Sequence, residues 1–128
     1  MGMLDGKVAL ITGGSRGQGR AHAVTCAREG ADVIIVDTRS QIGSVVYPMA
    51  QQADFDETVK QVEALDRRII AVEGDVRKQA DLDRAVERGV AEFGRIDILI
   101  ANAGIFSLAP AHELTDEMWD DMIGVNLT

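Results

Sequence analysis

Short apolar runs alternate with longer amphipathic segments along this chain. The runs are rich in β-branched residues and lack polar interruptions, which is typical of strands in a parallel sheet that is buried on both faces. We therefore predict strands at 8–12, 32–37, 69–73 and 96–101.

The intervening segments place apolar residues at helical spacing, so we predict a helix after each strand. The first helix is expected at 17–29 and to end at Gly30, because glycine tolerates the left-handed conformation that closes many helices. A last helix is expected to begin after Thr115, whose hydroxyl can accept a hydrogen bond from the first turn. The apolar positions of the second and third helices are Phe55, Val59, Val62 and Leu65, and Leu82, Ala85, Val86, Val90 and Phe93.

Repeated strand–helix units build a parallel sheet with right-handed crossovers and helices on both faces. The sequence therefore predicts an α/β fold, a Rossmann-type doubly wound parallel sheet with strand order 3-2-1-4, and 1–128 are expected to form the N-terminal portion of a single domain. The connection at 38–54 is longer than the usual loop of about two to six residues. We interpret it as a functional loop or an insertion.

The composition excludes several classes of function. The 128 residues carry 21 acidic and 13 basic side chains, a formal net charge of −8, whereas nucleic-acid surfaces need clustered Lys and Arg. The single cysteine, Cys26, excludes an intramolecular disulfide and a multi-cysteine metal site. The segment before Val8 is too short for a signal peptide, and no apolar run has the roughly 20 residues of a spanning helix. We expect a cytoplasmic protein with no nucleic-acid, membrane or metal partner.

The segment between the first strand and the first helix is rich in glycine, at Gly13, Gly14, Gly17 and Gly19. Glycines allow a tight turn and a close approach of the backbone to a ligand. The first N–H groups of the following helix are unpaired and point toward that ligand. Such a turn favours a phosphate or a pyrophosphate.

Two other motifs nearly coincide with this turn. The run at 13–17 matches the G-x-S-x-G nucleophile elbow of serine hydrolases, but that elbow needs an oxyanion donor from a loop after an earlier strand, and none is predicted. The glycines at 14 and 19 match the spacing of an NTPase phosphate loop. Arg20 and Ala21 then stand where that loop needs Lys and Ser or Thr. A dinucleotide-binding turn is the favoured interpretation.

An acidic residue at the end of the second strand tests this interpretation, because dinucleotide folds use it to bind the adenosine ribose. Asp37 stands there, at close to the expected interval of about 20 residues after the turn. The alternative is an aspartate that only begins a turn. A carboxylate about 4 Å from the 2′-phosphate of NADP would repel it by about 4 kcal/mol at an effective dielectric of about 20, which is about three decades in affinity. Arg16 and Arg39 offset part of this repulsion, and the predicted cofactor is NAD.

Four motifs follow one another along the chain in an order that resembles the short-chain dehydrogenase/reductase family over the whole length. The glycine turn has the family's spacing, Thr12-Gly13-x-x-x-Gly17-x-Gly19. The resemblance implies a Rossmann fold and an oxidoreductase of carbonyl–alcohol pairs. The three further motifs are Gly74-Asp75-Val76, Asn102-Ala103-Gly104 and Val125-Asn126-Leu127.

The resemblance also implies roles for individual residues. Asp75 is expected near the adenine amino group, and the motif at 102–104 is expected to close the cofactor site and support the glycine turn. Asn126 is the expected catalytic residue and would help to position a proton-relay water. Without the resemblance, Asn126 is a polar residue at a solvated or hydrogen-bonded edge of a helix. The expected cofactor-binding residues are Gly13, Ser15, Arg16, Gly17, Gln18, Gly19, Asp37, Thr38, Asp75, Val76, Asn102, Ala103, Gly104 and Val125.

The long connection carries a narrower resemblance. Tyr-Pro-Met-Ala at 47–50 and Phe-Asp-Glu-Thr-Val at 55–59 are similar to the insertion of carveol-dehydrogenase-like members, an actinobacterial subgroup associated with mycofactocin and with tightly held NAD. The resemblance implies that the insertion folds over the adenosine end of the cofactor and slows its release. The alternative is a surface loop without effect on the nucleotide.

Members of the family use a catalytic serine and a Tyr-x-x-x-Lys motif. The one tyrosine here, Tyr47, is followed four residues on by Gln51. The catalytic residues and the remaining strands are therefore expected beyond Thr128. The resemblance implies the N-terminal part of an NAD-dependent enzyme for a secondary alcohol or ketone, such as the terpenoid carveol. We expect the 128-residue chain to be inactive alone and to form a homo-oligomer; a stand-alone nucleotide-binding module without catalysis is the open alternative.

Overall fold

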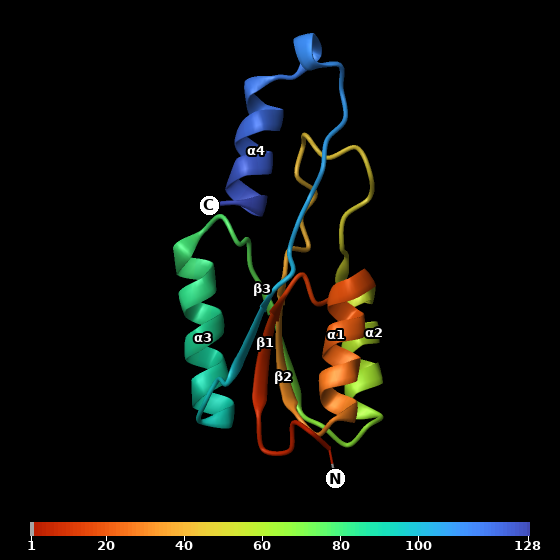
Figure 1. Cartoon of the computed structure of the whole chain (residues 1–128), viewed down its shortest axis with the longest axis vertical. Coiled ribbons are helices and arrows are strands. Elements are labelled where there is room, and N and C mark those ends of the chain that lie inside the picture. Colours follow the sequence, from red (N-terminus) through yellow and green to blue (C-terminus); the bar gives the residue numbers. More distant parts are fainter. Residues whose placement is uncertain (1) are drawn as a thin grey trace.

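The computed structural model describes residues 2–128 and contains one parallel sheet (Figure 1). The strands are β1 (Val8–Thr12), β2 (Asp32–Asp37), β3 (Ile69–Glu73) and β4 (Ile98–Ala101). Their order is β3-β2-β1-β4, so the predicted α/β class and strand order are confirmed. The helices are α1 (Gly17–Arg28), α2 (Gln52–Glu63), α3 (Gln79–Phe93) and α4 (Asp116–Asn126), with a 3-10 turn at Ala111–Glu113.

The central strand β2 explains why the apolar runs lack polar interruptions. Its β-branched residues are fully buried and point alternately to the two faces of the sheet. Val33 and Ile35 belong to the core beneath α1 and α2, whereas Ile34 and Val36 belong to the core beneath α3. Figure 1 shows α1 and α2 on one side of the sheet and α3 on the other. Both faces of β2 are therefore covered, as the sequence pattern requires.

Two helix boundaries differ from the prediction by a few residues. α1 ends at Arg28 with Glu29 as its capping residue, and Gly30 follows with a left-handed φ of 101°. α2 already begins at Gln52, so the last residues of the predicted 38–54 connection belong to this helix. The Asp54 carboxylate caps this start, because its Oδ2 accepts a hydrogen bond from the N–H of Gln51 at 2.8 Å. The irregular connection is 38–51.

Two expected apolar positions fall outside their elements. Leu65 follows the end of α2 and is 38% exposed. Ile96 precedes β4 and packs against the core beneath α3. Between Ile96 and the strand, the Asp97 carboxylate accepts a hydrogen bond from the N–H of Val8 at 2.9 Å. The fourth strand is therefore shorter than the predicted 96–101.

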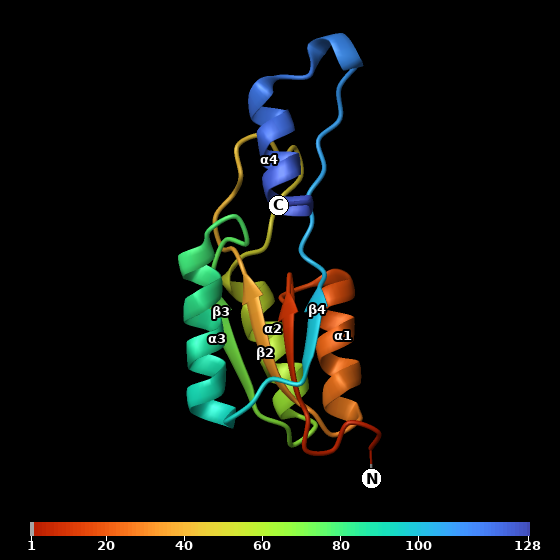
Figure 2. The same cartoon turned by 60° about the vertical axis from the view of Figure 1, so that its left-hand side comes forward.

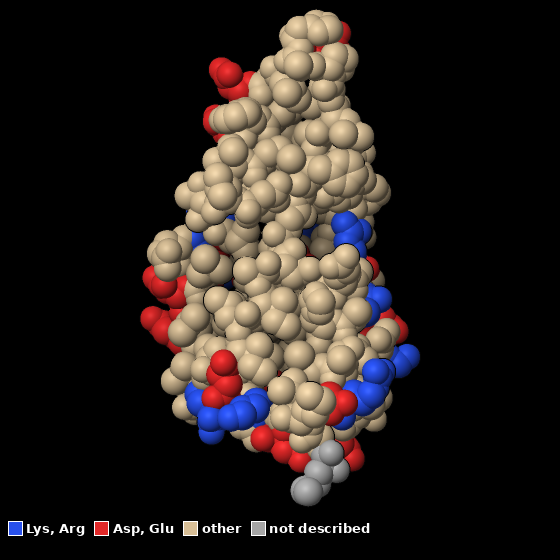
Figure 3. All heavy atoms as spheres, in the orientation of Figure 1, with Lys and Arg blue, Asp and Glu red and all other residues tan. Residues whose placement is uncertain are grey.

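The helix α4 lies apart from the sheet, beyond the carboxyl ends of the strands and beside the connection 38–51 (Figures 1 and 2). Thr115 accepts a hydrogen bond from the N–H of Met118 at 3.1 Å, which confirms the predicted N-cap. On the face of residues 2–128 seen in Figure 3, basic side chains lie around the sheet-bearing part and are interspersed with acidic ones. No helix within residues 2–128 is long and apolar enough to cross a membrane.

Candidate functional site

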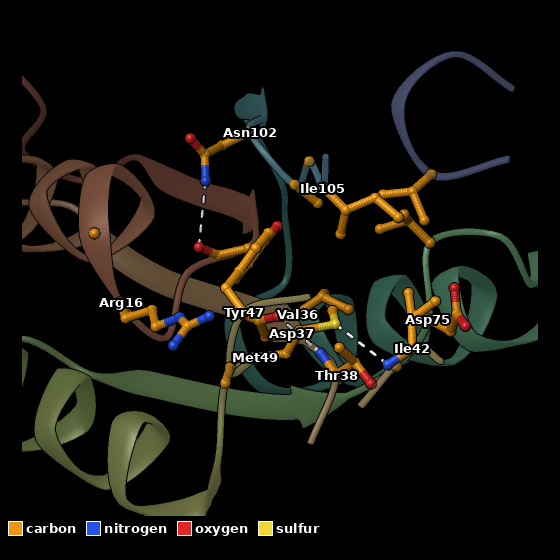
Figure 4. Close-up of a pocket in the computed structure, with 18 residues that line it drawn as sticks. Arg16, Val36, Asp37, Thr38, Ile42, Tyr47, Met49, Asp75, Asn102 and Ile105 are labelled. Carbon is orange, nitrogen blue, oxygen red and sulfur yellow. Dashed lines mark hydrogen bonds between the residues drawn. The ribbon is translucent and has the colours of Figure 1, made fainter. Parts of the chain in front are cut away.

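A cavity of about 230 Å³ lies at the carboxyl ends of the strands (Figure 4). The strand order reverses at this point, because β2 and β3 lie on one side of β1 and β4 lies on the other. Loops that leave such a switch point diverge and form a crevice, where open α/β sheets bind their ligands. The topology therefore places a candidate binding site among the residues at and after the ends of the strands.

The turn after β1 forms one wall of the cavity. Gly13 and Gly17 have left-handed φ values of 70° and 60°, a conformation that glycine adopts without strain. Gly19 packs against the turn itself, because a Cβ there would lie 1.8 Å from the carbonyl oxygen of Gly13. The glycine spacing thus allows the chain to turn directly from β1 into α1 beside the cavity.

The residues after β4 hold this turn in place. Thr12 Oγ1 accepts hydrogen bonds from the N–H groups of Asn102 and Ala103, each at 3.1 Å. The side-chain amide of Asn102 donates to the carbonyl oxygen of Gly13 at 3.2 Å (Figure 4). The end of β4 is therefore joined to the glycine turn through both backbone and side chain, which is the support expected of the motif at 102–104.

Asp37 ends β2 and lines the cavity beside the glycine turn. Its Oδ2 accepts hydrogen bonds from the Ser15 N–H at 3.2 Å and from the Ser15 hydroxyl at 2.5 Å. Its Oδ1 accepts a hydrogen bond from the Thr38 N–H at 2.8 Å. A carboxylate has about four lone-pair sites, so Oδ1 keeps one site for a ligand hydroxyl.

Asp75 follows β3 and lines the same cavity, but its carboxylate is engaged by Arg77. Arg77 Nη2 donates to Asp75 Oδ2 at 2.7 Å, and Arg77 Nη1 donates to Asp121 Oδ1 on α4 at 2.6 Å. The hydrogen bond from the Arg77 guanidinium holds the pKa of the Asp75 carboxyl below its usual value. Arg77 was not among the predicted site residues. Its position two residues after Asp75 could have indicated an ion pair with that aspartate.

The connection 38–51 forms an apolar wall of the cavity. Ile42, Val45 and Met49 form a small core with Ile105, which follows β4. Tyr47 stacks on the ring of Phe106, with the ring centroids 4.7 Å apart. The resemblance implied that this connection covers the cofactor, but the sequence did not identify the residues that form the wall, because their contacts join segments far apart in the chain. The residues that the connection adds to the cavity lining are Ile42, Tyr47, Met49 and Ala50.

Polar contacts tie the same connection to the rest of the site. Arg16 Nη2 donates to the carbonyl oxygen of Pro48 at 2.6 Å. The hydroxyl of Ser44 donates to Asp121 on α4 at 2.6 Å, and the hydroxyl of Ser107 donates to the carbonyl oxygen of Ser44 at 2.8 Å. The connection is thus attached to the glycine turn at one point and to α4 and the chain after β4 at others.

Asn126 lies at the end of α4, and both ends of its side-chain amide make hydrogen bonds to the backbone of Ile105. Its Oδ1 accepts a hydrogen bond from the N–H of Ile105 at 2.9 Å, and its Nδ2 donates to the carbonyl oxygen of Ile105 at 2.8 Å. This pair of bonds holds the end of α4 against the chain that leaves β4. The side chain therefore acts as a hydrogen-bonded clamp, and the expected role in a proton relay stays a prediction.

Comparison with known proteins identifies the family that uses this arrangement. Residues 7–128 match the family model described as short chain dehydrogenase. The chain belongs to the short-chain dehydrogenase family. It is 52% identical over 99% of its length to an uncharacterised NAD-dependent oxidoreductase of Mycobacterium tuberculosis, of which it covers 46%. It is 46% identical over its full length to the (-)-trans-carveol dehydrogenase of Rhodococcus erythropolis, of which it covers 47%.

Solved short-chain dehydrogenases share the fold described above. The crystal structure of a carveol dehydrogenase from Mycobacterium avium in complex with NAD superposes with a TM-score of 0.95 and 45% identity. The match covers 99% of this chain and 46% of that one. The resemblance to carveol-dehydrogenase-like members is therefore confirmed, and the chain spans about half the length of these relatives.

Most of the residues that the short-chain dehydrogenase motifs predicted for the cofactor meet at this cavity. Ser15, Gln18 and Gly19 do not line it, since Ser15 lies behind Asp37 and Gly19 packs against the turn. The lining also includes Val36, Gly74 and Ile105, which were not predicted. The predicted residues that line the cavity are Gly13, Arg16, Gly17, Asp37, Thr38, Asp75, Val76, Asn102, Ala103, Gly104 and Val125.

Proposed function

We propose that this chain forms the NAD-binding part of an alcohol dehydrogenase that interconverts a secondary alcohol and a ketone, with terpenoids such as carveol as the substrate class. The observation that carries the proposal is the Asp37 carboxylate, which lines the cavity beside the glycine turn and keeps one acceptor site. Relatives that are named for NAD and for carveol support the cofactor and the substrate class.

The pyrophosphate of NAD is expected over the start of α1. Arg16 is the N-cap residue and makes no side-chain cap hydrogen bond, and in the described chain the first turn of α1 carries no acidic residue. The unpaired N–H groups and the positive end of the helix dipole are therefore available to an anion. Gly13 and Gly17 line the cavity at this point, so the backbone can approach the phosphates closely.

The adenosine is expected between the ends of β2 and β3. The remaining site on Asp37 Oδ1 would accept a ribose hydroxyl, whereas the charge of Asp37 would repel a 2′-phosphate. The two arginines that could offset this repulsion have other partners. Arg16 donates to the Pro48 carbonyl, and Arg39 pairs with Glu73 at 2.5 Å. NAD rather than NADP is therefore the cofactor that these residues fit.

We further propose that the connection 38–51 slows the release of NAD. Its apolar residues line the cavity, and its polar residues are tied to the glycine turn through Arg16 and to α4 through Ser44. A nucleotide beneath the connection could leave only after some of these contacts open. The alternative, a surface loop that does not contact the cavity, would leave the release of NAD unaffected.

When bound, NAD supplies the hydride acceptor or donor of the reaction. The contribution of this chain is to bind and orient the adenosine half of the cofactor. Tyr47, its one tyrosine, is stacked on Phe106 in the connection, and Gln51 stands where a Tyr-x-x-x-Lys motif would need lysine. We therefore propose that proton transfer needs a Ser and a Tyr-x-x-x-Lys that the 128 residues do not contain.

Titration calorimetry with NAD tests the binding role, and native mass spectrometry of the purified chain tests retention. We expect NAD and ADP-ribose to bind, a fraction of the chain to carry NAD through purification, and no hydride transfer with a panel of secondary alcohols. Failure of both nucleotides to bind would overturn the proposal. Detectable turnover would contradict the proposal that the 128 residues lack the catalytic groups. A coding sequence that continues past Thr128 into Ser and Tyr-x-x-x-Lys would separate the enzyme from a stand-alone binding module.

A further inference from the structure

Ser15 lies behind Asp37 rather than in the lining of the cavity. It is fully buried, and its N–H and its hydroxyl both donate to Asp37 Oδ2, at 3.2 and 2.5 Å. We propose that Ser15 is a positioning residue, which fixes the Asp37 carboxylate and thereby sets the discrimination between NAD and NADP. The inference rests on the proposed NAD site, and it replaces the direct cofactor contact that the family resemblance implied for Ser15.

Ser15 can position another residue because it is itself held from two helices. Its carbonyl oxygen accepts hydrogen bonds from Arg20 Nη2 on α1 and from the Thr58 hydroxyl on α2, each at 2.7 Å. Arg20 Nη2 also donates to the carbonyl oxygen of Asp54 at 3.1 Å. The peptide at Ser15 is therefore fixed on its carbonyl side, and its N–H and hydroxyl are presented to Asp37 from a rigid frame.

The position of the carboxylate decides how strongly a 2′-phosphate is rejected. Charge repulsion falls with distance, so an aspartate that can change its rotamer can turn away from the phosphate and weaken the rejection. Hydrogen bonds to an ionised acceptor are stronger than neutral ones, and Oδ2 of Asp37 receives two of them from Ser15. Loss of the hydroxyl leaves the carboxylate with the N–H groups of Ser15 and Thr38 alone, so Asp37 can turn more easily.

The test compares the affinities of the 128-residue chain for NAD and NADP, measured by titration calorimetry at one ionic strength. In Ser15→Ala, we expect the preference for NAD to fall about tenfold, because one charge-assisted hydrogen bond no longer orders the carboxylate. In an Asp37→Ala background the same change is expected to leave the preference unaltered, since Ser15 acts through Asp37. This coupling separates a positioning role from a general loss of structure.

Thr58→Val provides a matched control, because Thr58 contacts the carbonyl of Ser15 and not Asp37. We expect this variant to lower the melting temperature and to keep the NAD preference of the wild type, because Arg20 still holds the Ser15 carbonyl and the Ser15 hydroxyl is unchanged. Ser15→Cys keeps a side chain of similar size with a weaker donor, so its preference is expected between those of the wild type and Ser15→Ala. Ser15→Cys also provides the measurement if alanine prevents folding.

The outcomes separate this inference from the proposed function. If the wild type binds neither NAD nor NADP, the proposed function fails. If it binds NAD with a clear preference and the Ser15 variants keep that preference, only the positioning role is overturned. An equal loss of preference in the Asp37→Ala background would overturn the positioning role as well.

Discussion

The centre of the sheet and the β4–α4 side of the molecule differ in how completely the described chain covers them. Ile34 and Ile35 of β2 are fully buried between two layers of helices. By contrast, Leu99 on β4 is 68% exposed and Trp119 on α4 is 65% exposed, and among residues 2–128 none of those in α4 is buried. The adenosine end of the proposed site therefore rests on strands that are buried on both faces. The other end rests on β4 and α4, whose side chains remain largely exposed.

The largest expected effect tests this comparison through stability. Ile34→Ala removes a fully buried side chain and is expected to lower the free energy of unfolding by about 2–5 kcal/mol. Leu99→Ala is the matched control in β4 and is expected to cost less than about 1 kcal/mol, because its side chain already contacts water. Urea unfolding followed by circular dichroism measures both. Equal losses would contradict the difference between the two regions.

The next effect concerns the binding of NAD at the end of β2, where the sheet is covered on both faces. Asp37→Ala removes the acceptor expected for the ribose, so NAD affinity is expected to fall by about ten- to a hundredfold in titration calorimetry. Asp83→Ala on the outer face of α3 is the control, and it removes the same charge far from the cavity. A comparable loss in both variants would indicate that net charge, rather than the position of Asp37, governs binding.

The exposed side formed by β4 and α4 leads us to predict that the chain self-associates. An apolar strand at the edge of a sheet offers unpaired backbone groups to another chain, so we expect the wild type to form oligomers. Leu99→Lys is expected to shift it toward a monomer, whereas Leu65→Lys, away from β4, is expected to leave the oligomers intact. Light scattering over a range of concentrations measures both. A wild-type chain that stays monodisperse and monomeric at high concentration would contradict this prediction.

The smallest expected effect is electrostatic. It concerns Arg77, which connects Asp75 at the end of β3 to Asp121 on α4. The Arg77 guanidinium lowers the pKa of Asp75 in the folded state, so the pair stabilises the fold above the unfolded pKa of about 3.9 and loses its effect as the pH falls through the lower folded value. Arg77→Gln is expected to cost less than about 1 kcal/mol at neutral pH, because the pair is partly solvated. The cost should shrink under acidic conditions in urea unfolding; a cost independent of pH would point to packing instead.

Local patterns in the sequence were sufficient for the sheet and for much of the site. Uninterrupted β-branched runs require burial on both faces, and short connections between strand and helix leave few topologies. The glycine turn and Asp37 were identified because they lie at the carboxyl ends of strands, which a parallel sheet brings to one edge. Asn102 was identified because its motif resembles that of the family. These features depend on backbone geometry, which a single sequence encodes locally.

The remaining features depend on contacts between distant segments, which a single sequence does not specify. The wall formed by Ile42 and Met49 exists because Ile105 packs against them. The bond from Arg77 to Asp121 likewise requires that α4 lies beside the end of β3. Ser15 was assigned to the cofactor because it stands in the glycine turn, yet its hydroxyl faces Asp37. The turn could be predicted, but the direction of each side chain within it could not.

The clamp between Asn126 and Ile105 has a thermodynamic consequence for the site. Ile105 lines the cavity, and Asn126 holds it by two hydrogen bonds from the end of α4. Cavity and helix therefore form one coupled unit. A contact that fixes α4 is expected to change the affinity for a ligand in the cavity, and by reciprocity the ligand would change the strength of that contact by the same factor. We therefore expect ligand binding in the cavity to influence any self-association of the chain through α4, and self-association to influence ligand binding.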